Sequence, residues 1–295
     1  MCAANPGRAR EDCRHGQDHR RHNRLPAGFA RQYDIPIIPQ VINFGDDTYY
    51  EGVDMDAETF MARLKASAEL PKTAAPPPHL FAEQFQRLAP LGEPILCIHP
   101  SAEISGTVRS ATVAALDFPD ADIRIIDTRL VASPLGTIVR LAAEAAAAGS
   151  DGDTVAALAR DMGRRGRIYF LVSTLEYLAK GGRIGGAAAL LGSVLSIKPI
   201  LRLEDGRIES HERERTHKRA LARLREIVLE QVPRDGDGYL SVMYAGNPEE
   251  GEALAAELGR AINQPDVPVV AMPPAIITHG GPGLLAAGFF APREK

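Results

Sequence analysis

The sequence has few cysteines and few aromatic residues, and it contains no tryptophan. Its three cysteines are scattered and odd in number, which excludes a disulfide framework and is typical of a reducing compartment. The aromatic content of 5% gives no indication of an aromatic-lined pocket. No apolar run reaches the roughly 18 residues of a membrane span, and the N-terminus lacks the apolar core of a signal peptide. These absences predict a cytoplasmic protein without stable membrane insertion.

The chain also lacks an excess of positive charge. Its formal net charge is −4 at pH 7, which argues against a general nucleic-acid binder. A hydrophobic content of 45% and a charged content of 24% are ordinary values for a globular protein. A chain of 295 residues is long enough for a sizeable core and for two domains.

Residues 1–24 differ from the rest because they are crowded with arginine and histidine and show no periodicity. This composition predicts a disordered tail. Four side chains of the segment are potential metal ligands, but their spacing, C-x-H-x3-H-x2-H, matches no zinc pattern; they are Cys13, His15, His19 and His22. We therefore expect no metal site.

The remainder of the chain alternates between strand and helix patterns, which is the signature of an α/β fold with crossover helices. The clearest run is a strand at 94–100, a helix at 101–116, a strand at 122–128 and a helix at 134–149. It predicts a mainly parallel sheet in the first part of the chain. A polar stretch rich in glycine and arginine near 160–166 predicts the boundary between two α/β domains, 25–163 and 164–295.

Shorter elements flank this run. Before it we predict a short helix from Leu25, a strand at 35–44, a helix at 56–67 capped by Asp54, and a helix at 80–89. The prolines of residues 70–80 exclude a helix and predict an ordered loop. After the run we predict a strand at 167–173, helices around the following glycines, a hairpin at 196–209 turning at Asp205–Gly206, a helix at 218–232, a strand at 239–246, a helix at 249–263 and a strand at 267–273.

The stretch "KGGRIGGAAALLGSVLSIKPIL" from Lys180 to Leu201 resembles a phosphate loop only superficially. A Walker loop follows a strand and places its lysine after the glycines, whereas here the lysine comes first and a helix precedes it. A dinucleotide fingerprint is absent as well. Two interpretations remain: the glycines allow close backbone packing, or the small residues line a long apolar pocket.

The segment "HPSAEISGT" lies where a strand ends and a helix begins, the usual ligand position in open α/β sheets. Ser101, Ser105 and Thr107 offer hydroxyls there, and the helix N-terminus offers free N–H groups that suit an anion such as a carboxylate or a phosphate. The alternative interpretation is that a serine only caps the helix.

Two further loops carry candidate ligand-binding groups. "KTAAPPP" presents Thr73 in a loop held rigid by prolines, and "ITHGGPG" places His279 after an apolar strand and before three glycines. An imidazole can donate a hydrogen bond to an anion in its neutral or charged form. No carboxylate pair or Cys–His couple has a persuasive spacing, so we predict a binding site with no catalytic residue and no cofactor.

Several of these motifs together resemble one family. "LEYLAKGGRIGGAAALLGSVLSIKPIL", "ISGTVRSA", "LPKTAAPPP", "EGVDMDAETF" and "THGGPG" follow the order seen in DegV proteins, a bacterial fatty-acid-binding family. The resemblance runs from about Leu25 to Phe290. It implies two α/β domains with a long-chain fatty acid between them. It also implies that hydroxyls of the loop around Thr73 and of the Ser-Gly-Thr turn hold the carboxylate, with His279 nearby.

The resemblance further implies a carrier and not an enzyme. Members of this family present the fatty acid to a separate fatty-acid kinase, which makes acyl phosphate for phospholipid synthesis. Two alternatives stay open: a phosphotransferase component related in fold to dihydroxyacetone-kinase domains, and a lipid-sensing regulator.

The chain departs from the family pattern at the head-group loops. Ala74, Ala75 and Ala102 replace polar residues, so fewer head-group contacts are expected and Lys72 is a candidate for supplying charge. Further candidates for head-group or partner contacts are Lys180, Arg183 and Arg202.

The largest departure is at the start of the chain. The family begins with a strand of the type Lys-Ile-x-Ile-Val-Thr-Asp-Ser-Thr-Ala-Asp before Leu-Pro, whereas residues 16–24 read "GQDHRRHNR". A shift of the reading frame by one base permits a family-like strand there. We therefore expect residues 1–24 to come from a frameshift or a miscalled start, and the first strand of the sheet to be missing.

Overall fold

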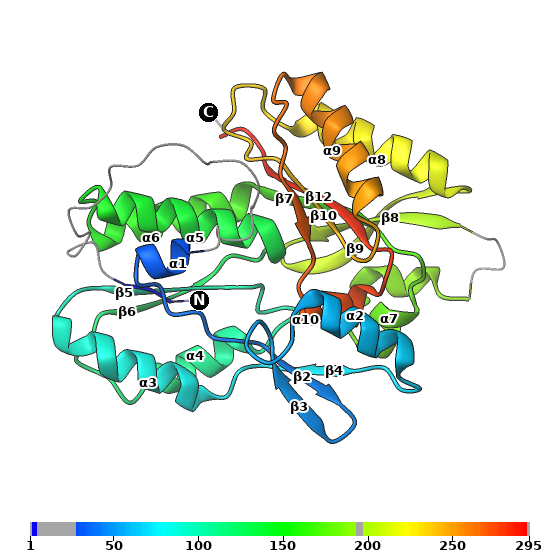
Figure 1. Cartoon of the computed structure of the whole chain (residues 1–295). Coiled ribbons are helices and arrows are strands. Elements are labelled where there is room, and N and C mark those ends of the chain that lie inside the picture. Colours follow the sequence, from blue (N-terminus) through cyan, green and yellow to red (C-terminus); the bar gives the residue numbers. More distant parts are fainter. Residues whose placement is uncertain (1, 5–27, 193–196, 294–295) are drawn as a thin grey trace.

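The computed structural model of the chain describes residues 2–4, 28–192 and 197–293, which build a mixed α/β molecule with three sheets (Figure 1). The predicted α/β class is confirmed. Two of the sheets belong to the first part of the chain and the third to the second part. The division at 163/164 stays a prediction; it falls in the last turn of a helix that ends at Arg165, just before the first strand of the largest sheet.

The first sheet is sandwiched between two pairs of helices. Its order is β1 (Cys2–Ala4), β5 (Ile95–His99), β6 (Ile123–Asp127). Alternate residues of β5 point to opposite faces, so Cys97 packs with α3 and α4 while Ile98 packs with α5 and α6. All of β5 is buried, as expected for a strand covered on both faces. The helices are α3 (Pro78–Leu88), α4 (Thr107–Ala115), α5 (Ala132–Ala147) and α6 (Gly152–Arg165).

The strand directions only partly follow the prediction of a mainly parallel sheet. β5 and β6 run parallel, with Ile95 opposite Ile123, whereas β1 runs antiparallel to β5. Because residues 2–4 form a strand, the prediction of a disordered tail is wrong for these three residues. The remainder of that segment, including Cys13 and the three histidines, lies outside the described residues.

The second sheet is small and antiparallel, with the order β3 (Asp47–Tyr50), β2 (Val41–Phe44), β4 (Lys72–Ala74). The predicted strand at 35–44 begins only at Val41, since Pro36 and Pro39 cannot donate ladder hydrogen bonds. The prediction of an ordered loop at 70–80 is wrong on both sides of Pro76 and Pro77. It contains β4, and α3 begins at Pro78 because proline is tolerated in the first turn of a helix.

Helix α2 (Ala57–Ala66) packs on this small sheet, where Phe60 contacts Phe44 of β2, whereas α1 (Phe29–Gln32) lies near α5 and α6 (Figure 1). The prediction that Asp54 caps α2 is wrong. Asp56 is the cap and accepts a hydrogen bond from the Thr59 N–H at 2.8 Å, while Asp54 accepts one from the Tyr50 N–H.

The third sheet has six strands, in the order β11 (Val269–Ala271), β10 (Ser241–Tyr244), β12 (Leu285–Phe290), β7 (Gly166–Leu171), β8 (Lys198–Glu204), β9 (Arg207–Glu214). β10 and β11 run parallel and the other neighbouring pairs run antiparallel. The predicted hairpin is confirmed with its turn at Asp205–Gly206. Helices α8 (His217–Gln231) and α9 (Pro248–Ile262) cover one face (Figure 1).

Helix α5 covers the other face of the six-stranded sheet and so lies between that sheet and the first sheet (Figure 1). One buried apolar cluster therefore crosses the molecule. It includes Ile42 of β2, Phe60 of α2, Val139 of α5, and Phe170 and Leu201 of the six-stranded sheet. We call it the shared core. None of the helices in the described part of the chain has the length and hydrophobicity that a membrane crossing requires.

Four short helices complete the fold: η1 (Ala89–Leu91), α7 (Glu176–Lys180), η2 (Gly185–Leu190) and α10 (Pro274–Gly280). The prediction that His279 follows a strand is wrong, because the residue lies in the last turn of α10. Helix α10 packs against α7 from its own part of the chain and against α2, β2 and β4 from the first part. It therefore stands where the two parts meet.

Candidate ligand-binding site

β4 and α10 meet through a hydrogen bond between side chains that lie 206 residues apart in the sequence. The Oγ1 atom of Thr73 and the Nε2 atom of His279 are 2.7 Å apart, and both residues are half-buried. Thr73 is held in register by β2, where it pairs with Ile42. Two of the predicted site residues are thus in direct contact.

The turn between β5 and α4 lies beside the same strand. Gly106 faces Ala75 so closely that an added Cβ would be 3.1 Å from the Ala75 Cβ. In this turn the Ser105 Oγ and Thr107 Oγ1 atoms are 2.7 Å apart. Thr107 is buried, whereas Ser105 is half-buried and keeps its hydroxyl near the surface of the turn. The turn that carries Ser105 and Thr107 therefore packs against the segment just after Thr73.

His279 is neutral at neutral pH. Burial lowers its pKa to about 4, and the nearby positive charge of Arg183 acts in the same direction. A neutral imidazole carries one N–H donor and one acceptor nitrogen. Nε2 meets Thr73, and the buried Nδ1 has no hydrogen-bond partner among the described residues.

Arg183 brings positive charge to this group of side chains. Its Nη1 donates to the Gly181 carbonyl at 2.6 Å and its Nε donates to the Ile104 carbonyl at 3.3 Å. Both acceptors are neutral, so the guanidinium charge is not neutralised by them. Lys180 differs, because it forms an ion pair with Glu176 on the same helix. Lys72, at the start of β4, is exposed.

The glycine-rich motifs on either side of the site pack into each other. A Cβ at Gly181 would overlap the Nδ1 atom of His279, and a Cβ at Gly281 would overlap the ring of Tyr177. Glycine is therefore required at both positions for α7 and α10 to approach as they do. This contact supports the interpretation of these glycines as close-packing residues.

Apolar side chains adjoin the polar group. Leu178 of α7, Ile277 of α10 and Leu284 before β12 belong to the shared core, as do Ala187 and Leu190 of η2. The small-residue run of η2 therefore contributes to the same apolar cluster as α7 and α10. Ala188 and Ala189 of η2 are exposed.

Ser101 is also near the turn but is engaged differently from Ser105. It is fully buried, and its Oγ donates to the Gly206 carbonyl at 2.8 Å and accepts from the Glu103 N–H at 3.2 Å. Four of the five predicted head-group residues thus form two hydrogen-bonded pairs, Thr73 with His279 and Ser105 with Thr107, whereas the Ser101 hydroxyl is bound to the hairpin.

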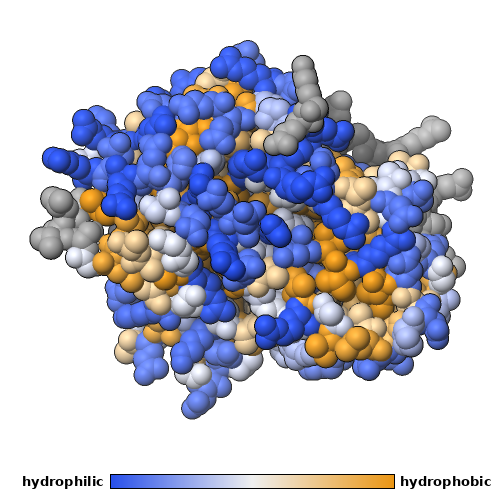
Figure 2. Space-filling model, turned by 180° about the vertical axis from the view of Figure 1, so that it is seen from behind, coloured by the Kyte–Doolittle hydropathy of each residue, from blue (hydrophilic) through white to orange (hydrophobic). Residues whose placement is uncertain are grey.

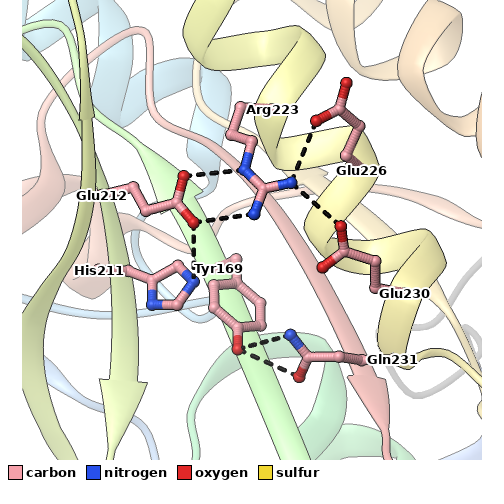
Figure 3. Close-up of polar contacts among 7 residues, drawn as sticks. All are labelled: Tyr169, His211, Glu212, Arg223, Glu226, Glu230 and Gln231. Atoms are coloured by element: carbon pink, nitrogen blue, oxygen red, sulfur yellow. Dashed lines mark hydrogen bonds and ion pairs between the residues drawn. The ribbon is translucent and has the colours of Figure 1, made fainter.

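Arg202 lies on the other face of the six-stranded sheet. Its neighbours Leu201 and Leu203 point into the shared core, so Arg202 points toward the α8 side, where it pairs with Glu204 at 2.6 Å. Arg202 pairs with Tyr169 across β7 and β8, and its charge acts on His211, so it lies near the polar cluster drawn in Figure 3. In this cluster Arg223 binds Glu212 with two hydrogen bonds, His211 lies beside that carboxylate, and Tyr169 is hydrogen-bonded to Gln231 (Figure 3). This cluster joins α8 to β7 and β9.

The rest of the described surface offers no comparable site. Within the described ranges no group of three or more His, Cys, Asp or Glu side chains could hold a metal ion. Apolar residues reach the surface on the side of the molecule where α3 and α4 lie (Figure 2), and exposed examples are Leu91, Val113 and Leu116.

Two residues of the site had no signal in the sequence. Gln40 donates its side-chain N–H to the Thr107 hydroxyl at 3.1 Å across 67 residues. Glu51 accepts a hydrogen bond from the backbone N–H of Ala275, in the first turn of α10, at 2.8 Å across 224 residues. Neither lies in a recognisable motif, because long-range contacts of this kind depend on how the elements pack.

The chain is similar in sequence to known proteins. A family model described as an uncharacterised protein of the DegV family matches residues 23–292. A DegV domain-containing protein of Streptomyces coelicolor is 38% identical over 266 residues, which cover 88% of this chain and 92% of that protein.

Solved structures show the same fold. A fatty-acid-binding DegV family protein of Streptococcus agalactiae has a TM-score of 0.84 at 30% identity, covering 91% of this chain and 95% of that one. DegV of Bacillus subtilis, described as a fatty-acid-binding protein, has a TM-score of 0.82 at 28% identity, covering 92% and 96%.

Proposed function

The chain belongs to the DegV family, and from this membership we propose that it binds a long-chain fatty acid between its two parts. The observation that carries the proposal is the contact between Thr73 and His279, which joins a polar head-group site across the two parts beside the shared core. A fatty acid needs both components, because its carboxylate must be hydrogen-bonded and its chain must be buried.

The residues of the site divide into donors and supports. Thr73, Ser105 and His279 are half-buried. Because Thr73 and His279 share one hydrogen bond, one of these two residues keeps a hydrogen for a carboxylate, and Ser105 keeps its own when Thr107 is the donor of their pair. Arg183 supplies the opposite charge, and among the described residues its hydrogen bonds go to neutral backbone carbonyls. Thr107 is buried behind Ser105 and, with Gln40, fixes the orientation of that hydroxyl.

The acyl chain is assigned to the apolar region next to His279. Leucine and isoleucine side chains of this region, such as Leu178, Ile277 and Leu284, belong to the shared core. Each buried CH₂ group contributes about 0.8 kcal/mol, so a chain of 14 to 18 carbons provides most of the binding free energy. The head group then sets orientation.

We further propose that the protein presents the carboxylate to a separate kinase instead of modifying it. The groups around the head-group site are suited to binding: hydroxyls, a neutral imidazole and a guanidinium. The resemblance of the motifs to the DegV family supports the same role.

Lipid extraction and native mass spectrometry of gently purified protein test the proposal. A co-purifying mass of a C14–C18 fatty acid is expected, and the delipidated protein should rebind the same acid. The Arg183→Gln variant should bind at least tenfold more weakly, since a hydrogen-bonded charge is lost. Arg260→Gln, on the exposed side of α9, serves as the matched control.

The alternative functions give different results. A phosphotransferase component would turn over ATP without any partner protein, whereas the carrier should show ATP-dependent acyl-phosphate formation only after a kinase is added. A protein that neither retains nor rebinds a fatty acid would contradict the proposed function.

A further inference from the structure

The tip of the β8–β9 hairpin contacts the turn that carries Ser105. Ser101, the first residue of this turn, is fully buried, and its hydroxyl hydrogen points to the Gly206 carbonyl at 2.8 Å. A serine hydroxyl has one hydrogen to donate. Since Ser101 donates this hydrogen to the Gly206 carbonyl, it cannot donate one to a carboxylate.

Gly206 is required at the hairpin tip for two separate reasons. Asp205 and Gly206 both have positive φ angles, 47° and 83°, which is the geometry of a type I′ hairpin turn. An added Cβ on Gly206 would also overlap the Oγ atom of Ser101. The hairpin can therefore approach the turn closely only with glycine at this position.

Charged contacts flank this hydrogen bond on both sides. Arg207 pairs with Glu103 at 2.7 Å, and Asp205 pairs with Arg129 at 3.2 Å. Both pairs are exposed, so each contributes little to stability, but together they orient the hairpin on the turn. Arg183 adds a third contact from the same part of the chain through the Ile104 carbonyl.

We propose that Ser101 and Gly206 are positioning residues for head-group binding and that the β8–β9 hairpin tip sets the place of Ser105. The inference rests on the proposed function. A displacement of Ser101 would also displace Ser105, because the Ser105 N–H donates to the Ser101 carbonyl at 3.0 Å. Ser105 in turn meets Thr107, which begins α4. The second part of the chain thus orients a head-group donor of the first part.

A double-mutant cycle on Ser101→Ala and Gly206→Ala tests the inference, with fatty-acid affinity measured by displacement of a fluorescent fatty acid. Each single variant should bind about tenfold more weakly. The double variant should bind about as well as either single variant, because both substitutions break one contact and Ser101→Ala removes the atom that Gly206→Ala would meet.

Two controls separate positioning from general destabilisation. Ser241→Ala removes another buried serine that donates to a backbone carbonyl, that of Gly288, and should lower thermal stability without weakening binding. Gly92→Ala places a Cβ at a positive φ of 71° with no atom within 4 Å and should also leave binding unchanged.

A spectroscopic signature adds a direct readout of the head group. With a fatty acid labelled with ¹³C at its carboxyl carbon, Ser101→Ala and Gly206→Ala should shift the bound carboxyl resonance in the same direction. The inference is overturned if Gly206→Ala leaves both affinity and resonance unchanged while Ser101→Ala alters them, since Ser101 would then touch the ligand. Failure of the wild type to bind would instead contradict the proposed function.

Discussion

At the scale of single residues, His279 is the side chain whose ionisation should report on the ligand. Its pKa is about 4 without a bound anion, because burial and the charge of Arg183 both disfavour the imidazolium. A carboxylate beside the ring favours the charged form and so should raise this pKa. NMR titration of the imidazole should show the rise when fatty acid is added to delipidated protein.

The same residue makes the stability of the ligand-free protein depend on pH. Because the folded pKa lies below the unfolded value of 6.5, the unfolded chain binds more protons between pH 4 and 6.5, and stability falls as pH falls through that window. Replacing His279 with Gln should flatten the pH dependence of urea unfolding there by roughly 1–3 kcal/mol, whereas His79→Gln should not. An unchanged slope in His279→Gln would contradict the assignment.

His99 is a second buried histidine, outside the head-group site. It is fully buried on β5 with its ring edge-on to Phe81, neither ring nitrogen has a hydrogen-bond partner among the described residues, and burial lowers its pKa well below 6.5. Replacing it with Leu should raise the free energy of unfolding by about 1–2 kcal/mol at pH 7, since the cost of burying an unpaired polar ring disappears.

This gain should grow at pH 5, because the unfolded wild-type chain then takes up a proton that the folded His99 does not. Urea unfolding at both pH values measures the effect, with His79→Leu as the exposed control. A less stable His99→Leu protein at both pH values would show that the ring has a role in the native state.

Single residues were predictable from the sequence where they belong to a motif. Thr73, Ser105 and His279 stand in recognisable motifs, and in the structure Thr73 contacts His279 while the turn that carries Ser105 packs beside β4. Gln40 and Glu51 could not be predicted, since their contacts span 67 and 224 residues and depend on packing. The commitment of the Ser101 hydroxyl to Gly206 likewise depends on a hairpin about 100 residues away.

At the scale of elements, α10 is the one whose placement decides the position of His279. The helix has seven residues, and Glu51 from the first part of the chain accepts the hydrogen bond of its Ala275 N–H. So short a helix has little stability of its own and depends on such tertiary contacts.

Removing this cap should weaken fatty-acid binding. Glu51→Ala should lose about 1 kcal/mol of stability and bind fatty acid several-fold more weakly, as α10 loses a fixed end. Asp151→Ala removes the cap of α6, a hydrogen bond to Thr154 N–H at 2.7 Å, and should lower stability alike without changing affinity. Equal affinities of the two variants would argue against a role of Glu51 in placing His279.

Elements with a clean periodicity agreed with their predictions, and short ones with mixed signals did not. Helix α8 lies within one residue of its predicted bounds, and the β8–β9 hairpin turns where predicted, although β9 continues to Glu214, five residues beyond the predicted end. Helix α10 contains "AIIT", whose β-branched residues favour a strand, yet its contacts with α7 and α2 keep it helical. Likewise β4 forms because Thr73 and its neighbours pair with β2, although prolines follow directly.

At the scale of the whole molecule, the shared core joins the two parts more strongly than a boundary at 163/164 suggests. Residues of β2, α2, α5, β7, β8, β12 and α10 contribute to one buried cluster. Helix α5 packs against the first sheet and against the six-stranded sheet. Gly288 of β12 lies close to Pro134 at the start of that helix. The molecule should therefore unfold in a single transition, because neither part can lose its packing without exposing the other.

A ligand held between the two parts should stabilise this single transition. At a free concentration one hundred times its dissociation constant, a fatty acid adds about 2.7 kcal/mol to the free energy of unfolding, which corresponds to a rise of several degrees in Tm. Differential scanning calorimetry of delipidated protein, before and after addition of the fatty acid, measures this rise. The methyl ester of the same acid should stabilise the protein less, since it has the chain but no charged carboxylate for Arg183 and His279. Two separate transitions, of which the ligand shifts only one, would show that the fatty acid lies within one part of the chain and does not bridge both.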